Sequence, residues 1–409
     1  MRKDMKSITL TDAQNKKKNQ IIDWFNSPSR LKNEPVFPLL GVAGSGKSSI
    51  IPYILEELNI KEEQVAYCAY TGMASLVLIK KGLSACTCHK LCYIPVEVED
   101  KFTHKKKIIF KKKEELEGDI KLIVLDEGSM INEEMMNDIL SFNIPILMIG
   151  DFFQLQPVGG KMNMFMKMTH YGILDEPLRQ ALDNPIIWIS DKLRHKEIPK
   201  YGTYDNSLRI HKKSNFPEEV LYNTDQIIAG KNSTCDYLAK LIRIKFKKIK
   251  SKYPVDGDKL ICIRNNWEKQ IFENALDVYL VNGLLGNVKN VRYKERDKTF
   301  TCDFKPTFLE NTYFNNLLSD KLTFDNVECK DENYVRDEYK DVAFSRIPLY
   351  SSATQINKFM FGDAITVYKM QGSQERHITY IDEVLNRNIY FNHFYTAVTR
   401  AEEELDIVM

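Results

Sequence analysis

The sequence predicts an α/β protein built on doubly wound parallel sheets, and three observations support this. First, the short apolar runs "IKLIVLDE" and "IPILMIGD" are rich in branched side chains on both faces, as is typical of strands buried between helices. Second, helical patterns alternate with these runs, as they do in βαβ units. Third, two of the runs end in carboxylates, and such sheets bind ligands at the carboxyl ends of their strands.

Length and composition narrow the class of protein. A chain of 409 residues is too long for one simple core, so about two to four domains are expected. With 43% hydrophobic and 28% charged residues, the chain resembles a soluble globular protein. It has no apolar run long enough for a membrane span and no signal-peptide stretch at its start. Because the net charge is only +2, a nucleic-acid site must come from local basic patches.

The predicted domains follow from these patterns. Residues 12–30 form a lysine-rich helix, and residues 35–40 form the first strand. Short strand-like runs with Gly or Asn turns indicate antiparallel structure in residues 256–355, after which parallel strands resume. We therefore expect a first α/β domain (1–92 and 118–175), a hairpin insertion (93–117), a second α/β domain (176–255 and 356–409) and a β-rich insertion (256–355).

The first chemical motif is "GVAGSGKS" at residues 41–48. It matches the phosphate-binding loop, in which glycines let backbone N–H groups surround phosphates at the start of a helix. Lys47 would reach the β- and γ-phosphates of ATP, and the Ser48 hydroxyl would bind Mg²⁺. The strand before and the helix after argue against a chance glycine turn. The remaining predicted nucleotide contacts of the loop are Gly41, Gly44, Ser45, Gly46 and Ser49.

Two further motifs follow strand ends. In "LIVLDEGSM", Asp126 ends a buried strand, where holding the water shell of Mg²⁺ explains an otherwise costly carboxylate. Glu127 beside it can orient and deprotonate the attacking water. The alternative is a pair of acids that cap the following helix. In "GDFFQLQP", the amide of Gln154 can sense the γ-phosphate.

One group of cysteines allows a different reading. The stretch "ACTCHKLCY" places Cys86, Cys88, His89 and Cys92 close together, and four such ligands can hold zinc. However, the first two cysteines are closer than in usual zinc motifs, and no second ligand pair follows. Small buried thiols in a reducing compartment are the favoured interpretation.

These motifs, in this order, resemble superfamily-one helicases, and within them the RecD-like and phage Dda-type group. "LTDAQ" resembles the adenine-reading Q motif, and "GDFFQLQPV" is close to the form typical of the RecD-like branch. Further matches to the group are "AYTGMASLVL", "TCHKL", "EPLRQ", "DQIIAGKNSTCDYLAKLI", "GDKLICIRNN…VNGLLGNV", "DAITVYKMQGSQ" and "YTAVTRA".

The resemblance implies two RecA-like domains that sandwich ATP, with a β-hairpin in the first and a small SH3-like β-barrel in the second. It implies an ATP-dependent DNA helicase that moves 5′ to 3′ on single-stranded DNA and acts at forks in replication, recombination or repair. We expect a monomer in the cytoplasm, or in the host cytoplasm if a phage encodes it. The alternatives are a translocase or RNA-directed remodeller that does not separate DNA, and a non-enzymatic single-strand binder.

The resemblance also assigns roles to individual residues. Arg179 and Arg400 are expected near the γ-phosphate, and Arg400 would reach it from the second domain as an arginine finger. Gln14 and Gly372 are expected to contact the nucleotide. The predicted DNA contacts are Thr71, His89, Asn232 and Thr366.

Two basic segments complete the sequence predictions. Residues 93–113 indicate a two-stranded hairpin where the resembled group inserts a strand-separating pin. Phe102, near its turn, either stacks on the last base pair of a fork or lies under a solvated lysine edge. Residues 240–252 form a lysine-rich helix with Leu241, Ile242 and Ile244 among its apolar positions. A solvated amphipathic helix is favoured there over a DNA contact.

Overall fold

The computed structural model describes residues 9–28, 30–99, 106–156, 173–175, 177, 184–273, 276–294, 298–325 and 356–409. The chain divides into two compact units. The first comprises Met1–Cys92, Lys113–Gly230 and Val367–Met409, and the second comprises Tyr93–Lys112 and Lys231–Thr366. In the parts of the chain that are described, no helix combines the length and apolar character that crossing a membrane requires.

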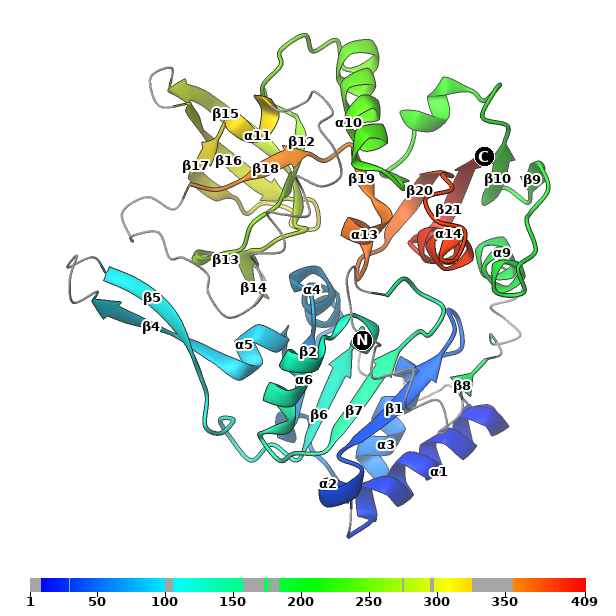
Figure 1. Ribbon diagram of the computed structural model, residues 1–409, viewed down its shortest axis with the longest axis vertical. Coiled ribbons are helices and arrows are strands. Elements are labelled where there is room, and N and C mark those ends of the chain that lie inside the picture. Colours follow the sequence, from blue (N-terminus) through cyan, green and yellow to red (C-terminus); the bar gives the residue numbers. More distant parts are fainter. Residues whose placement is uncertain are drawn as a thin grey trace. The chain divides into compact units, whose positions relative to one another are not determined.

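The first unit contains a parallel sheet with the strand order β3-β2-β6-β7-β1-β8 (Figure 1). The order of the strands differs from their order in the chain, as a doubly wound sheet requires. The predicted α/β class is therefore confirmed. The strands are β1 (Val36–Gly41), β2 (Val65–Ala69), β3 (Ala85–Thr87), β6 (Leu122–Asp126), β7 (Ile146–Gly150) and β8 (Ile173–Leu174). The helices around them are α1 (Asp12–Asn26), α2 (Arg30–Asn33), α3 (Ile51–Glu57), α4 (Gly72–Lys80), α5 (Cys88–Cys92) and α6 (Glu133–Leu140).

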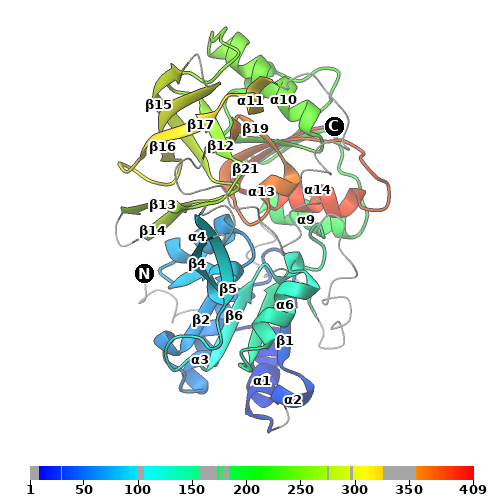
Figure 2. The same cartoon turned by 60° about the vertical axis from the view of Figure 1, so that its left-hand side comes forward.

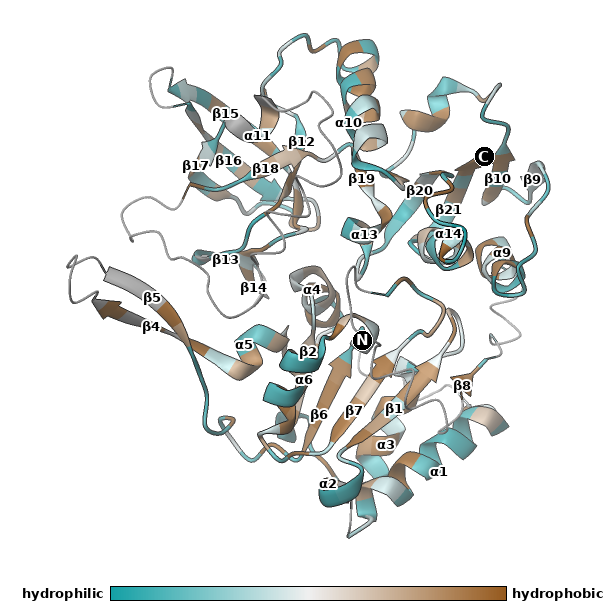
Figure 3. Cartoon of the chain, in the orientation of Figure 1, coloured by the Kyte–Doolittle hydropathy of each residue, from teal (hydrophilic) through white to brown (hydrophobic). Residues whose placement is uncertain are grey.

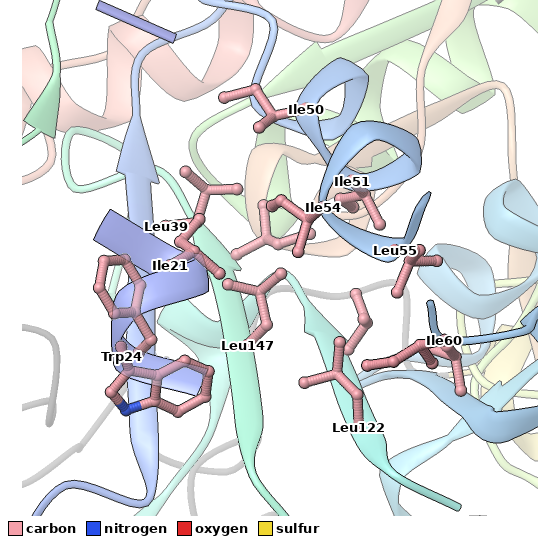
Figure 4. Close-up of a cluster of buried hydrophobic side chains, with 14 of the residues drawn as sticks. Ile21, Trp24, Leu39, Ile50, Ile51, Ile54, Leu55, Ile60, Leu122 and Leu147 are labelled. Atoms are coloured by element: carbon pink, nitrogen blue, oxygen red, sulfur yellow. The ribbon is translucent and has the colours of Figure 1, made fainter. Parts of the chain in front are cut away.

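Helices α1 and α3 cover one face of this sheet through a continuous apolar core (Figure 4). Ile21 and Trp24 of α1 and Ile54 of α3 pack with Leu122 and Leu147 of the strands. Burying each such side chain contributes roughly 1.5–3 kcal/mol. The alternate strand residues, Ile123, Leu125 and Met148, are also fully buried and face the other side of the sheet. Apolar residues on both strand faces explain the predominantly brown colour of β6 and β7 in Figure 3.

Two local features of the first unit follow directly from the sequence. Helix α1 begins at a capping box, in which the Thr11 hydroxyl accepts from the N–H of Gln14 and the Gln14 side chain accepts from the N–H of Thr11. Pro38 lies inside β1, although proline cannot donate a ladder hydrogen bond. It is tolerated because β8 pairs only with Leu40 and Gly41, beyond the proline.

The strands of a second sheet that belong to the first unit have the order β11-β20-β21-β10-β9. Its strands are parallel except for β9, which runs antiparallel to β10. Helices α9 and α14 pack against each other and against β21, as Figure 2 also shows. The elements are α9 (Pro185–Arg194), β9 (Gly202–Tyr204), β10 (Leu208–His211), β11 (Gln226–Ala229), α13 (Val367–Met370), β20 (Glu375–Ile381), α14 (Tyr390–Val398) and β21 (Ala401–Val408).

The second unit contains an antiparallel hairpin and a small β-barrel. The hairpin pairs β4 (Tyr93–Glu99) with β5 (Lys106–Lys112). In the barrel, five strands have the order β17-β16-β15-β12-β18, and a parallel bridge from Ser319 to Asn357 joins the two ends. The bounds of these strands and of further elements of the unit are β12 (Lys259–Cys262), β13 (Asn266–Glu273), β14 (Leu276–Leu280), β15 (Leu285–Lys294), β16 (Thr299–Pro306), β17 (Phe314–Asp320), α11 (Leu322–Asp325), β18 (Phe359–Phe361) and β19 (Ala364–Thr366).

The helix predicted over residues 240–252 is shorter than expected, and the side chains that it buries differ from the predicted ones. Helix α10 (Asn232–Leu241) continues only through a π-helical turn, Ile242–Phe246. The extra residue of a π turn rotates the side chains, so Ile244 is exposed and Arg243 is buried. The predicted solvated basic face is therefore wrong at Arg243.

Arg243 is buried against Asp258, which is fully buried. Two guanidinium nitrogens donate to the two carboxylate oxygens at 3.0 and 2.9 Å. Further donations go to the carbonyls of Ser251 and Tyr253, and the guanidinium lies 4.0 Å from the ring centre of Phe361. These contacts anchor the end of the helix to the barrel.

Removing Asp258 should therefore destabilise the second unit strongly. An Asp258→Ala variant leaves the Arg243 charge buried without its partner, which costs about 3–5 kcal/mol. Denaturant unfolding of the full chain would measure this loss. As a matched control, Lys305→Ala removes an exposed hydrogen bond of the same barrel and should change stability by less than about 0.5 kcal/mol. Equal effects of the two substitutions would contradict the assigned role of the buried pair.

Candidate nucleotide site

The loop after β1 has the geometry of a phosphate-binding loop. Gly44 and Gly46 adopt φ of 74° and 71°, a region that glycine enters without steric cost. A 3₁₀ turn, Ser48–Ile50, then leads into α3. The Lys47 ammonium donates to the carbonyl oxygens of Gly41 and Val42, both at 2.8 Å. The lysine thus closes the loop on itself, with its charge held by neutral acceptors.

Gln14 is buried beneath this loop, with 2% of its surface exposed. Its amide nitrogen donates to the carbonyl oxygen of Ser45 at 3.2 Å, while its amide oxygen is engaged in the capping box of α1. Both ends of the side chain therefore contact protein, and Gln14 connects the start of α1 to the phosphate loop. The sequence predicted a nucleotide contact for Gln14 but not this link.

Asp126 and Glu127 lie at the carboxyl end of β6. In the sheet, one strand, β7, separates β6 from β1, the strand that precedes the phosphate loop. Glu127 adopts a left-handed conformation, with φ of 51°, which is strained for a residue with a Cβ. Helix α6 is capped by Asn132, whose side chain accepts from the N–H of Met135. The alternative reading of the two acids as side-chain caps of this helix is therefore wrong.

The segment after β7 carries two buried polar side chains. Asp151 is 2% exposed, and one of its carboxylate oxygens accepts from the N–H of Phe153 at 3.0 Å. Gln154 is 7% exposed, and its Oε1 atom has no hydrogen-bond partner among the described residues. An orphaned buried acceptor is unusual in a native protein.

Arg400 is buried between the end of α14 and β21, with 4% of its surface exposed. Its guanidinium donates to the carbonyl oxygens of Thr396 and Ser373, each at 3.1 Å. A third donation goes to the Thr399 hydroxyl at 3.2 Å. All three acceptors are neutral.

The charged groups of the two sheets act on one another. Burial raises the pKa of Glu127, and the nearby positive charge of Arg400 opposes this rise. Burial likewise lowers the pKa of Arg400, against the negative charges of Glu127 and Asp151. Burial also raises the pKa of Asp126, while Lys81 and Lys47 draw it down. The structure therefore brings Lys47, Asp126, Glu127 and Arg400 into one electrostatic environment.

Helix α14 of the second sheet hydrogen-bonds directly to the first sheet's loops. The Tyr395 hydroxyl donates to Asp151 at 2.6 Å and accepts from the N–H of Ala43 in the phosphate loop at 2.8 Å. The Thr396 hydroxyl accepts from the N–H of Leu155 at 2.8 Å. Sequence reasoning missed these side chains, although Tyr395 and Thr396 lie within the quoted "YTAVTRA" motif.

Gly372 lies against the start of α4. Its φ is +79°, and a Cβ added there would lie 2.9 Å from the Thr71 hydroxyl and 3.0 Å from the Cβ of Ala74. Thr71 itself caps α4 by accepting from the N–H of Ala74 at 3.1 Å. The glycine is therefore required for this close approach.

The other predicted residues occupy varied positions. His89, on α5, is partly buried, and burial lowers its pKa. Asn232 is exposed in the first turn of α10, whereas Thr366 is buried at the end of β19. Arg179 and Phe102 lie outside the described residues. Within the described ranges, no three His, Cys, Asp or Glu side chains are grouped to hold a metal ion. A side-chain hydrogen bond with Cys88, together with burial, raises the pKa of the Cys68 thiol.

Comparison with known proteins agrees with this geometry. The family model of an AAA domain matches residues 30–215. An uncharacterized protein of Acanthamoeba polyphaga mimivirus, R530, is 28% identical over 274 residues, which cover 55% of this chain and 54% of that protein. The RecD subunit of the RecBCD enzyme from Buchnera aphidicola is 25% identical, over 92% of this chain and 70% of RecD. The chain spans only about half the length of the mimivirus relative.

Solved structures show the same fold. Pif1 helicases in a structure of unwinding at forked double-stranded DNA superpose with a TM-score of 0.52 and 16% identity, covering 98% of this chain and 92% of theirs. A Bacteroides Pif1 bound to single-stranded DNA gives a TM-score of 0.51 and 15% identity, covering 98% and 93%. The two-domain RecA-like architecture expected from the sequence is therefore confirmed. The chain is therefore similar in sequence to a RecD helicase subunit and shares its fold with Pif1 helicases.

Proposed function

We propose that the protein is an ATP-dependent DNA helicase that translocates 5′ to 3′ on single-stranded DNA. One observation carries this proposal. The phosphate loop and two acids of one sheet lie in the same electrostatic environment as Arg400 of the other sheet, whose guanidinium donates to neutral acceptors among the residues that the structure describes. A site divided in this way lets ATP draw two elements together and lets hydrolysis release them.

The chemistry assigned to the first sheet is phosphate and metal binding. We infer that Lys47 leaves the carbonyls of Gly41 and Val42 and turns toward the β- and γ-phosphates. Mg²⁺ would be held by the Ser48 hydroxyl and the Asp126 carboxylate, and it would neutralise phosphate charge when bound. The exposed Ser48 hydroxyl and the carboxylate at the end of β6 suit a hard cation. The raised pKa of Glu127 favours its role as the base that accepts a proton from water.

Arg400 would then supply the charge that hydrolysis requires. Its buried guanidinium exchanges neutral acceptors for the γ-phosphate, on which negative charge is redistributed in the transition state. Gln154, with its orphaned Oε1, would orient the attacking water or sense the γ-phosphate. Arg179 remains assigned to the same phosphate.

The polymer partner is proposed to be single-stranded DNA, together with forks. The RecD and Pif1 relatives supply the support for this assignment, along with the predicted contacts Thr71, His89, Asn232 and Thr366. The helix that Thr71 caps presents backbone N–H groups, which favour a phosphate. We also propose that the enzyme works with proteins of DNA replication, recombination or repair.

A fork-unwinding assay tests the function directly. Forked duplexes with a 5′ tail, a 3′ tail or no tail would be incubated with ATP and Mg²⁺. We expect unwinding of the 5′-tailed fork only, and ATP hydrolysis stimulated by single-stranded DNA more than by RNA. ATP hydrolysis without strand separation would support a translocase, stronger stimulation by RNA would support an RNA remodeller, and unwinding from the 3′ tail would reverse the assigned polarity.

Lys47→Ala should abolish ATP turnover, because it removes the ammonium group assigned to the phosphates. Weak binding of single-stranded DNA should survive, since other residues are assigned to that contact. Steady-state ATPase and fluorescence anisotropy would measure the two properties. Lys121→Ala, which removes an exposed lysine beside the same sheet, is the control and should retain wild-type turnover. A Lys47→Ala enzyme with normal DNA-stimulated turnover would show that the loop is not the catalytic one.

Arg400→Ala and Arg400→Lys should both reduce kcat by at least about a hundredfold, since arginine fingers contribute ~10³–10⁵ in kcat. Lysine is a poor substitute because it lacks the fork that meets two oxygens at once. Nucleotide affinity should change far less. Arg376→Lys, at an exposed arginine of the same sheet, should behave as wild type. An Arg400→Ala enzyme within about threefold of wild-type kcat would contradict the finger assignment.

A further inference from the structure

The Tyr395 hydroxyl occupies an unusual position, because it bonds to two loops of the first sheet from a helix of the second. Tyr395 is 1% exposed. Its Oη–H donates to Oδ2 of Asp151 at 2.6 Å, and the same oxygen accepts from the N–H of Ala43 at 2.8 Å. Burial and the Asp151 charge both raise the pKa of Tyr395, so the phenol keeps its proton and remains a donor.

Neighbouring side chains add further hydrogen bonds between the second sheet's elements and the segment after β7. Thr396, the next residue, accepts from Leu155, and the Gln371 amide donates to the carbonyl of Leu155 at 2.9 Å. Asn392, one turn earlier, donates to the carbonyl of Phe153 at 3.0 Å. The segment that carries Gln154 is therefore held to the second sheet at several backbone atoms.

The same helix leads into Arg400. The Thr396 carbonyl accepts from Nε of Arg400 at 3.1 Å, so the residue that holds Leu155 also orients the guanidinium. A displacement of α14 would move Tyr395, Thr396 and Arg400 together. That movement would also displace the phosphate loop, because the N–H of Ala43 donates to the Tyr395 hydroxyl.

We propose that the Tyr395 hydroxyl is a positioning group for ATP hydrolysis. By fixing Ala43 and Asp151 at once, it keeps the phosphate loop, the Gln154 segment and Arg400 in one geometry. This inference rests on the proposed ATPase function. The Tyr395 hydroxyl can make both bonds because it donates to Asp151 and accepts from Ala43 at once. Phenylalanine fills nearly the same space but can make neither hydrogen bond.

Tyr395→Phe tests the proposal, with Tyr380→Phe as a matched control. Tyr380, on β20, is also fully buried, and its hydroxyl contacts Asp382 at 3.0 Å and His393 of α14 at 3.2 Å. The control therefore loses a contact to the same helix but leaves the bonds to Ala43 and Asp151 in place. Each variant loses one buried hydroxyl from the same sheet. Steady-state kinetics with saturating single-stranded DNA would give kcat and KM for ATP, and thermal melting would give Tm.

We expect Tyr395→Phe to lower kcat by about tenfold to a hundredfold, the range associated with small displacements of catalytic groups, with KM changed less than about threefold. Tyr380→Phe should lower Tm to a similar extent but leave kcat near the wild-type value. Equal kcat for both variants, or a raised KM with unchanged kcat, would overturn the positioning role.

A second variant keeps the test decisive if Tyr395→Phe does not fold. Asp151→Asn is isosteric but keeps only one acceptor oxygen, so it cannot accept from both the Tyr395 hydroxyl and the N–H of Phe153. It should lower kcat with little change in KM; unchanged kcat would overturn the inference. A wild-type protein that does not hydrolyse ATP would overturn the proposed function and this inference with it. An active wild type with an equally active Tyr395→Phe enzyme would overturn the inference alone.

Discussion

The guanidinium of Arg400 is a buried positive charge that, within the described residues, donates its hydrogen bonds to neutral acceptors. Such a charge is costly to remove from water, and burial accordingly lowers its pKa. The negative charges of Glu127 and Asp151 oppose this shift, yet neither replaces the neutral acceptors. In the proposed function, the phosphate of a bound nucleotide supplies the anion that this charge lacks. Elements of the first unit hold this guanidinium in place through the carbonyl oxygens of Thr396 and Ser373.

Helix α14 provides that positioning. Its last turn holds the guanidinium through the Thr396 carbonyl, and its inner face bonds to the phosphate loop and to the segment after β7. On the other sheet, Lys47 binds the carbonyls of its own loop. Both cations are therefore held by neutral oxygens that a phosphate can displace. This shared feature gives a physical basis for coupling nucleotide binding to movement of the second sheet.

Local sequence patterns predicted much of the fold and part of the site. Branched apolar runs predicted strands such as β6, because a strand buried on both faces needs apolar residues at every position. The glycine spacing predicted the phosphate loop, because the left-handed φ of Gly44 and Gly46 requires that residue type. The acids after β6 were found for a similar reason: a carboxylate at the end of a buried strand needs an explanation.

Contacts between distant residues were not predictable in this way. The bond between Tyr395 and Ala43 joins residues 352 positions apart, and no periodicity encodes it. The partner of Gln14 in the phosphate loop is equally remote in sequence. Burial of Arg243 depends on one π-helical turn, and, in the part of the chain that is described, the ends of the barrel meet through a bridge between Ser319 and Asn357. Each of these features results from tertiary packing rather than from local pattern.

The central claim is that Arg400 completes a nucleotide site begun by Lys47, and one measurement tests it most directly. A crystal structure with ADP, Mg²⁺, aluminium fluoride and a single-stranded oligonucleotide would show the site with a mimic of the transferred phosphoryl group. The account predicts that Lys47 and Arg400 both leave their carbonyl acceptors and that each donates to the fluoride at about 3 Å. An Arg400 side chain that still donates to Thr396 and Ser373, with the fluoride facing water or other residues, would contradict it.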